Sequence, residues 1–262
     1  MQGAAGVYEQ TGNPGDEVQP GMYAFTRREV IGAGVAGFGA SLLSACGLFK
    51  SIDAPDAPLM NPFITVTVTS PKANANPTIG LSVPISSPTT EAFLYVPSGY
   101  TPAAPAPLLL MFHAENQTAF SAVSLFQPYA DAAGLVLLAV DSAGATWDII
   151  ADQHYGTDLQ FASAALAAVF NEVNIDPARV GVEGYSEGGS YALAIGRTNG
   201  NLFSHVIAFA PDFMPSYSPS GIPKFFMAQG IQDTVFDITE TGDVINAGLT
   251  AAGYTVDYVR FT

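Results

Sequence analysis

The stretch Arg179-Val-Gly-Val-Glu-Gly-Tyr-Ser-Glu-Gly-Gly189 decides the fold that this sequence predicts. Its first half is a short apolar segment, typical of a strand buried on both faces, and the residues from Ser186 to Gly196 favour a helix. Between the two lies Gly184-x-Ser186-x-Gly188, in which the glycines leave room for the close backbone contacts of a sharp strand-to-helix turn. The pattern therefore predicts a serine held above the edge of a sheet, next to a helix N-terminus that favours negative charge.

Apolar strand patterns and amphipathic helix patterns alternate along the chain on both sides of this turn. Strands are predicted over residues 63–69, 91–96, 107–112, 135–140, 179–184, 205–210, 224–229 and 254–262, and helices over 118–133, 158–173, 186–196 and 240–252. A strand-rich beginning followed by such alternation favours a mostly parallel sheet with helices on both faces. The 262 residues, 48% of them hydrophobic, suffice for one large core, so we expect one domain over 63–262.

The charge of the chain excludes one class of partner. The net charge is −15, with only 8 lysines and arginines. A protein that binds nucleic acid needs a basic surface to neutralise phosphates, so no nucleic-acid partner is expected. No cluster of His, Cys and Asp has the spacing of metal ligands, and we expect neither a metal nor an organic cofactor.

The first part of the chain has the features of an export signal. Met22 begins a segment in which Arg27 and Arg28 precede an apolar run of about 14 residues, too short for a bilayer, which needs about 20. Paired arginines before such a run predict a twin-arginine signal peptide over 22–45. Residues 1–21 are an N-terminal extension of uncertain status.

The signal ends in Leu43-Ser-Ala-Cys-Gly47, which resembles a bacterial lipobox. Cys46 is the single cysteine of the chain, so it has no disulfide partner within it. We expect Cys46 to be lipidated and to anchor the exported protein to the outer face of the bacterial cell membrane. Residues 46–62 would be the tether between this anchor and the domain.

A family resemblance rests on several segments together. Asp176-Pro-Ala-Arg-Val180 followed by Gly184-Tyr-Ser-Glu-Gly-Gly189 resembles bacterial α/β-hydrolase esterases of the phospholipase/carboxylesterase and polyhydroxyalkanoate-depolymerase groups. Phe203–Phe209 and Thr146-Trp-Asp148 add to the likeness, which covers roughly residues 90 to 262. The resemblance implies the α/β-hydrolase fold and a serine esterase activity.

A serine hydroxyl needs a base, and the base needs an acid to orient it. With Ser186 as the nucleophile, this fold orders the catalytic residues as Ser, then Asp or Glu, then His. The family resemblance implies Asp233 as the acid, because Gly230, Asp233 and Val235 match its Gly-x-x-Asp-x-Val pattern. Asp237 and Asp212 are the alternatives.

An oxyanion hole takes one backbone N–H from the residue after the nucleophile, here Glu187, and one from a loop that follows an early strand. Residues 112–117 occupy that place, and we expect Glu115 to supply the second donor, with Ala114 as the alternative. Relatives carry His-Gly where this chain has His113-Ala114, which changes the backbone freedom of the loop.

The sequence has no histidine in the position along the chain that is expected for the catalytic base. None of the histidines His113, His154 and His205 follows Asp233. In relatives, the histidine comes shortly after a strand like 254–262. We therefore expect it beyond Thr262, in a longer form of the protein, with the hydrolase domain over 63–262 truncated at its C-terminal end.

The predicted reaction is ester hydrolysis. Ser186 would attack a carboxylic ester, a small molecule, lipid or polyester, and form an acyl-enzyme that water then releases. A catalytically inactive, hydrolase-like lipoprotein with a binding role is the first alternative. An acyltransferase on the same fold is the second.

Overall fold

The computed structural model describes residues 63–262 except 68–75, 153 and 215–217. Its sheet contains eight strands in the order β1-β2-β4-β3-β5-β6-β7-β8. The strands are β1 (Gly80–Ser86), β2 (Glu91–Val96), β3 (Ala106–Phe112), β4 (Val136–Val140), β5 (Ile175–Tyr185), β6 (His205–Phe209), β7 (Lys224–Gly230) and β8 (Val256–Phe261). The helices are α1 (Ala119–Ala133), α2 (Asp148–Ala151), α3 (Thr157–Glu172), α4 (Glu187–Thr198) and α5 (Gly242–Ala251).

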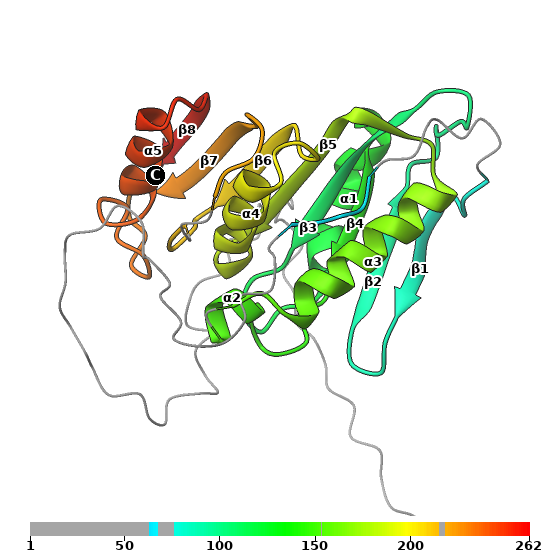
Figure 1. The fold of residues 1–262 in the computed structure, drawn as a ribbon, viewed down its shortest axis with the longest axis horizontal. Helices are drawn as coiled ribbons and strands as arrows, with labels where there is room; N and C mark the ends of the chain where they lie inside the picture. Colours follow the sequence, from blue (N-terminus) through cyan, green and yellow to red (C-terminus); the bar gives the residue numbers. More distant parts are fainter. Residues whose placement is uncertain (1–62, 68–75, 153, 215–217) are drawn as a thin grey trace, which may run out of the picture. The chain divides into compact units, whose positions relative to one another are not determined.

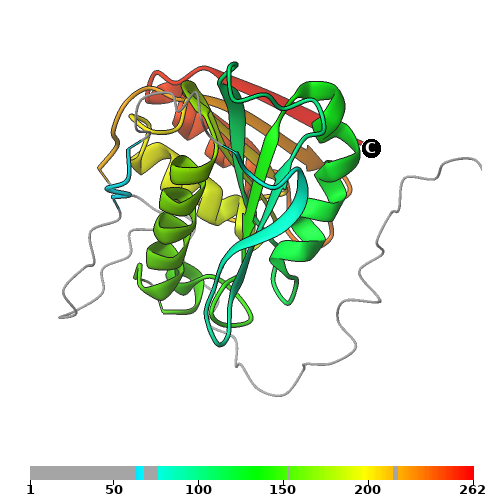
Figure 2. The same cartoon turned by 90° about the vertical axis from the view of Figure 1, so that its right-hand side faces the viewer.

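The sheet is parallel from β4 to β8, and β2 runs antiparallel to both of its neighbours, β1 and β4. Helices α3, α4 and α5 lie on one face and α1 on the other (Figures 1 and 2). This arrangement confirms the predicted mostly parallel sheet with helices on both faces. Because parallel strands point the same way, the loops that follow β3, β5, β6 and β7 gather at one edge, the carboxyl edge of the sheet.

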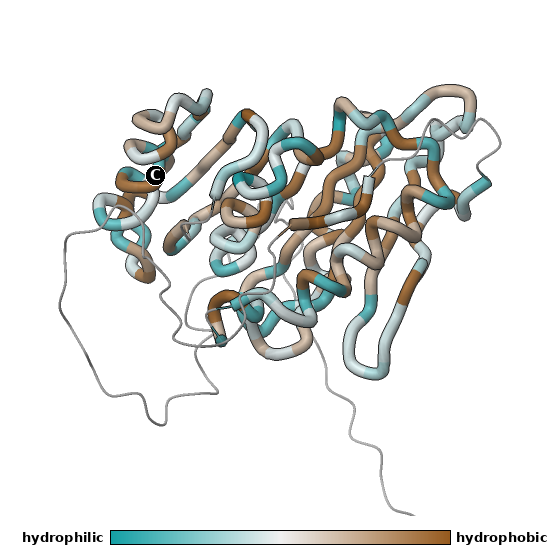
Figure 3. The backbone as a smooth tube through the Cα atoms, viewed as in Figure 1, coloured by the Kyte–Doolittle hydropathy of each residue, from teal (hydrophilic) through white to brown (hydrophobic). Residues whose placement is uncertain are grey.

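Two apolar clusters hold these layers together. The larger lies under α3 and α4, where Leu110 and Val182 are fully buried beside Leu166 and Ile195. The smaller lies under α1 and includes Met111 and other residues of β3 and β4. The central strands are accordingly the most hydrophobic part of the tube in Figure 3, and the strands buried on both faces carry the continuous apolar runs that predicted them.

Two strand predictions differ from the structure. The predicted strand 63–69 is wrong over 63–67, which has no regular structure, and its last two residues lie outside the described residues. Instead, the Ile64 backbone N–H donates to Asn199 Oδ1 at 2.7 Å, and the Ile64 side chain packs into the core, so the alternation reflects packing of a loop. The edge strand β1 was not predicted, since Pro84 interrupts its pattern; an edge strand tolerates proline, and the pairing shifts register between Ser82 and Ile85.

The helix predictions agree more closely with the structure. Pro128 lies inside α1, and the helix is continuous through it. Thr118 caps α1, with its side chain accepting from the Ser121 N–H at 3.2 Å. The short helix α2 was not predicted. Within the described residues, every helix is too short or too polar to span a lipid bilayer.

Candidate active site

Ser186 directly follows β5 at the carboxyl edge of the sheet and has an unusual backbone conformation. Ser186 has φ 58° and ψ −123°, and α4 starts at the next residue. A non-glycine residue in this region costs roughly 1–3 kcal/mol and persists only where the surroundings enforce it. Here the Ser186 N–H donates to the Phe209 carbonyl on β6 at 2.8 Å, and the Ser190 N–H donates to the Ser186 carbonyl at 3.1 Å. Ser186 therefore lies at a sharp strand-to-helix turn, half-buried and fixed from both sides.

The glycines of the motif are required by contacts with backbone. A Cβ on Gly184 would lie 2.1 Å from the Gly188 carbonyl oxygen. A Cβ on Gly188 would lie 2.3 Å from the Phe112 carbonyl oxygen at the end of β3. Both neighbours are backbone atoms, which cannot shift without a large cost in free energy. The turn and the end of β3 are therefore in direct backbone contact.

The loop that follows β3 is fixed by His113. Its Nε2 accepts the Ser142 N–H at 3.0 Å, so Nδ1 carries the proton and donates to the Ala114 carbonyl at 2.8 Å. The Trp147 indole N–H donates to the His113 carbonyl at 2.9 Å. Burial lowers the pKa of His113, which agrees with a neutral ring whose two nitrogens are both engaged.

The three predicted oxyanion donors meet around the turn. Ala114 and Glu115 follow the end of β3, against which Gly188 packs, and Glu187 begins α4. Among the described residues, no acceptor takes a hydrogen bond from the backbone N–H of Ala114, Glu115 or Glu187. These N–H groups are thus available to a ligand, as an oxyanion hole requires.

Asp233 lies in the loop after β7, at the same edge. Its N–H donates to the Gly230 carbonyl at 3.2 Å, and its Oδ1 accepts the N–H groups of Val235 at 2.8 Å and Phe236 at 3.1 Å. Burial and, second, the Asp233 charge raise the pKa of Tyr185, the residue before Ser186. Asp233 Oδ1 is therefore engaged in the local turn near Ser186, and among the described residues no hydrogen bond is formed to Oδ2.

The alternative acids are placed differently. Asp237 is exposed, and its Oδ1 accepts from the Thr239 N–H at 2.9 Å and the Thr239 hydroxyl at 2.7 Å. Asp212 follows β6, and its N–H donates to Ser190 Oγ at 3.0 Å on the first turn of α4. Asp212 thus also lies close to Ser186, whereas Asp237 forms a local turn of its own.

None of the histidines is positioned as the base. Both ring nitrogens of His113 are engaged by backbone groups, Nδ1 in its own loop and Nε2 in the loop after β4. His154 Nδ1 contacts the Asp152 carbonyl at 2.9 Å. His205 begins β6, four residues before Phe209, and at about 3.3 Å per residue that puts it roughly 13 Å from the carboxyl edge.

Two features of the site were not predicted. The Thr146 hydroxyl donates to Glu187 Oε2, which ties the loop after β4 to the turn. Nearby, Asp148 and Asp158 form a buried clamp: Asp158 Oδ2 accepts the Asp148 N–H at 2.8 Å, and Asp148 Oδ2 accepts the Asp158 N–H at 3.1 Å. Burial raises the pKa of both carboxyls. The two lie in the first turns of α2 and α3, ten residues apart, and no sequence pattern indicates their pairing.

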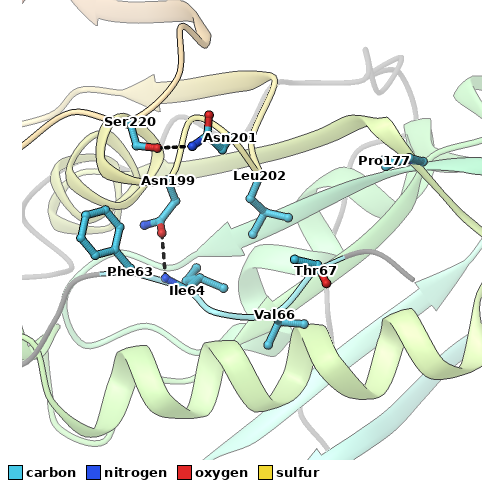
Figure 4. A pocket seen from close by; sticks show the side chains of 9 residues that line it. All are labelled: Phe63, Ile64, Val66, Thr67, Pro177, Asn199, Asn201, Leu202 and Ser220. Carbon is cyan, nitrogen blue, oxygen red and sulfur yellow. Dashed lines mark hydrogen bonds between the residues drawn. The ribbon is translucent and has the colours of Figure 1, made fainter. Parts of the chain in front are cut away.

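The described part of the chain has no metal-binding cluster, and the cavity in Figure 4 is lined by none of the predicted site residues. No group of three or more His, Cys, Asp or Glu side chains there could hold a metal ion. A cavity of about 310 Å³ lies between residues 63–67 and the C-terminal end of α4 (Figure 4). Its lining includes Asn199 and Leu202 but none of the predicted site residues, and since α4 runs away from Ser186, it opens at the opposite edge of the sheet.

Solved structures with the same fold include esterases and a related hydrolase. A thermostable esterase superposes with a TM-score of 0.55 at 18% identity, over 66% of this chain and 50% of its own length, so the chain spans half of that relative. The S-formylglutathione hydrolase FrmB of Staphylococcus aureus gives 0.52 at 14% identity, over 67% and 88% of the two chains. Esterase 2 of Thermogutta terrifontis, phosphonylated by cyclosarin, gives 0.52 at 18% identity, over 71% and 83%. These likenesses confirm the α/β-hydrolase fold.

Sequence comparison gives the family. No curated protein matches the chain. The profile of a family described as "Putative esterase" matches residues 87–247, more than half of the chain, and this segment includes Ser186 and Asp233. The chain therefore belongs to the Putative esterase family.

Proposed function

We propose that this protein is a serine carboxylic-ester hydrolase that forms an acyl-enzyme on Ser186. The observation that carries the proposal is the conformation of Ser186, with φ 58°, enforced by Gly184, Gly188 and the bond to Phe209. Strain of this kind is retained where it serves function, and here it presents a hydroxyl at a helix N-terminus. Family membership and the esterases among the structural neighbours support the same activity.

In the proposed reaction, the Ser186 hydroxyl loses its proton to a base as its oxygen attacks the ester carbonyl. The tetrahedral oxyanion accepts hydrogen bonds from the Glu187 N–H and from the N–H of Glu115 or Ala114. The alcohol leaves with the proton from the base, and water then releases the acid from Ser186. Asp233 orients the base through the oxygen that its own turn leaves unused.

The base is proposed to be a histidine on chain that follows β8. The reason is the position of that strand: the Ile231 N–H donates to the Phe261 carbonyl at 2.8 Å, so β8 ends beside the loop that holds Asp233. A residue a few positions after Phe261 would emerge at the carboxyl edge, next to Asp233. None of the three histidines in residues 1–262 occupies that position.

The experiment is covalent labelling of the product of the complete native gene with a fluorophosphonate probe, followed by assays on short-chain esters. We expect labelling and turnover that are both lost in Ser186→Ala. Ser204→Ala is the matched control, because Ser204 lies at the amino end of β6 and bonds the Val180 carbonyl at 3.1 Å. Absence of Ser186-dependent labelling would refute the proposal and favour the hydrolase-like binding protein, which the placement of the three histidines also favours.

Export and anchoring are a separate part of the proposal. The twin-arginine signal over 22–45 and Cys46 lie outside the described residues, and their sequence features alone support a lipid-anchored protein on the outer face of the membrane. Mass spectrometry of the mature N-terminus tests this: a diacylated peptide beginning at Cys46 is expected, and an unmodified Cys46 within a longer peptide would contradict it.

A further inference from the structure

Gln229 is a fully buried amide near the end of β7, shortly before the proposed acid Asp233. Side chains alternate between the two faces of a strand, so Gln229 shares the face of Phe225 and Met227. These two residues belong to the larger apolar cluster together with residues of α5. An amide is rarely buried so deeply unless hydrogen bonds hold its polar atoms. The partners of the Gln229 amide therefore indicate its role.

The partners of this amide lie on the loop that carries Asp233. Gln229 Nε2 donates to the Phe236 carbonyl at 3.2 Å and to Thr241 Oγ1 at 2.9 Å. Because a carbonyl oxygen can only accept, the contact with Phe236 identifies the end of the amide that is the NH2 group. The Thr241 hydroxyl then accepts from Gln229 and donates to the Asp237 carbonyl at 2.9 Å.

The amide oxygen of Gln229 takes no part in this arrangement. It is buried and, among the described residues, has no hydrogen-bond partner. An unpaired buried oxygen destabilises a fold, so the two hydrogen bonds of the NH2 group account for an amide at this position. Both bonds hold the same loop, one near its middle at Phe236 and one at its end, where α5 begins after Thr241.

Few buried side chains hold the loop from 231 to 241. It contains turns but no helix or strand, and among its residues, all of them described, Ile238 is the one apolar side chain that is buried. Phe236 links the amide to the acid, because its carbonyl accepts from Gln229 while its N–H donates to Asp233 Oδ1 at 3.1 Å. The position of the Asp233 carboxylate therefore depends on Gln229 through one intervening residue.

We propose that Gln229 is a positioning residue of the active site, which holds the loop after β7 in the shape that presents Asp233 to the catalytic base. The inference rests on the proposed esterase function and adds a residue to it. Gln229 lies on the α5 side of the sheet and acts through Asp233, without contact to the substrate. Loss of its NH2 group would release Phe236, and a shift of about 1 Å in a catalytic group can lower the rate about a hundredfold.

The test measures hydrolysis of 4-nitrophenyl acetate by the product of the complete native gene. Gln229→Met keeps the approximate volume of the side chain and removes its hydrogen bonds. We expect kcat to fall about 10- to 100-fold while KM changes less than about twofold, because the acid serves the chemical step. The acid limb of the kcat/KM profile should move to lower pH by about one unit, since a displaced carboxylate no longer favours the protonated base.

A double-mutant cycle separates positioning of the acid from general damage to the fold. In an Asp233→Asn background, Gln229→Met should change kcat less than about twofold, because the group that Gln229 positions is already absent. Asn174→Leu is the control: Asn174 is also a buried amide, and its Nδ2 donates to the Pro102 carbonyl at 2.7 Å at the amino edge of the sheet. It should leave kcat and the pH profile unchanged.

A second pair of variants carries the test if urea unfolding shows that Gln229→Met does not fold. Thr241→Val removes an acceptor of the Gln229 amide and should lower kcat, whereas Thr241→Ser keeps the hydroxyl and should not.

The outcomes separate this inference from the proposed function. If hydrolysis depends on Ser186 but Gln229→Met and Thr241→Val match the wild type in kcat and pH profile, Gln229 does not position the acid and the esterase function stands. The same conclusion follows if the losses from Gln229→Met and Asp233→Asn simply multiply. If the wild type shows no hydrolysis that depends on Ser186, the function itself fails, and the inference fails with it.

Discussion

Replacing Glu183 by glutamine should remove a strong pH dependence from the stability of this protein. Glu183 lies on β5 between Met111 of β3 and Ile207 of β6, on the face covered by α1, and is only 2% exposed. Among the described residues, nothing forms a hydrogen bond or ion pair with its side chain. Burial in these apolar surroundings raises the pKa of Glu183 to about 8.

The sign and size of this pH effect on the free energy of unfolding follow from the difference between the pKa values of Glu183 in the folded and unfolded states. The folded state keeps a proton that the unfolded chain releases near pH 4.5, so the stabilisation is complete below that pH and is lost as pH rises through 8. Each pH unit in this window is worth about 1.4 kcal/mol. Between pH 5 and 7.5, the free energy of unfolding of the wild type should therefore fall by about 3 kcal/mol more than that of Glu183→Gln.

Urea unfolding followed by tryptophan fluorescence measures this difference. Trp147 is the single tryptophan and is fully buried, so its emission reports on the core. Glu172→Gln, an exposed change at the end of α3, should track the wild type at every pH. The reasoning is refuted if the Glu183→Gln and wild-type curves of unfolding free energy against pH run parallel.

Two other substitutions test the architecture of the site. Gly188→Ala would bring a methyl group against the Phe112 carbonyl. We expect the free energy of unfolding in urea to fall by about 2 kcal/mol or more and the labelling of Ser186 to be lost. Gly99→Ala is the control: its new methyl group meets no atom within 4 Å, so it should change neither quantity. His113→Phe removes two hydrogen bonds and leaves the Ser142 N–H unpaired, so it should cost about 2–3 kcal/mol by the same assay. A shifted pH profile of labelling in His113→Phe would contradict its structural role and point to a base.

The elements that the sequence predicted well are those whose pattern has one physical explanation. An unbroken apolar run such as Leu108–Phe112 is satisfied only by burial on both faces, and β3 lies in the middle of the sheet. The turn at Ser186 was predictable because Gly184 and Gly188 meet a local steric need. The alternation of apolar and polar residues is a less specific signal for a strand. Residues 63–67 alternate because one side of this segment packs on the core, although the segment pairs with no strand.

Contacts between segments far apart in the chain could not be predicted in this way. The bond from Thr146 to Glu187 and the Asp148–Asp158 clamp depend on how the loop after β4 folds back on the helices. Their residue types are ordinary for a polar loop. Likewise, Asp212 and Asp233 each follow an apolar strand, and only the tertiary structure shows that both lie near the turn while Asp237 forms a separate one.

The contacts of the Ser186 turn also bear on the stage of folding at which Ser186 adopts its strained backbone conformation. Its backbone conformation depends on β6 through the Phe209 carbonyl and on β3 through the packing of Gly188. These strands are adjacent to β5 in space but are separated from it in the chain by whole helices. We therefore expect Ser186 to adopt its strained backbone during folding only after both β3 and β6 have paired with β5, so the reactive serine reports that the centre of the sheet is assembled.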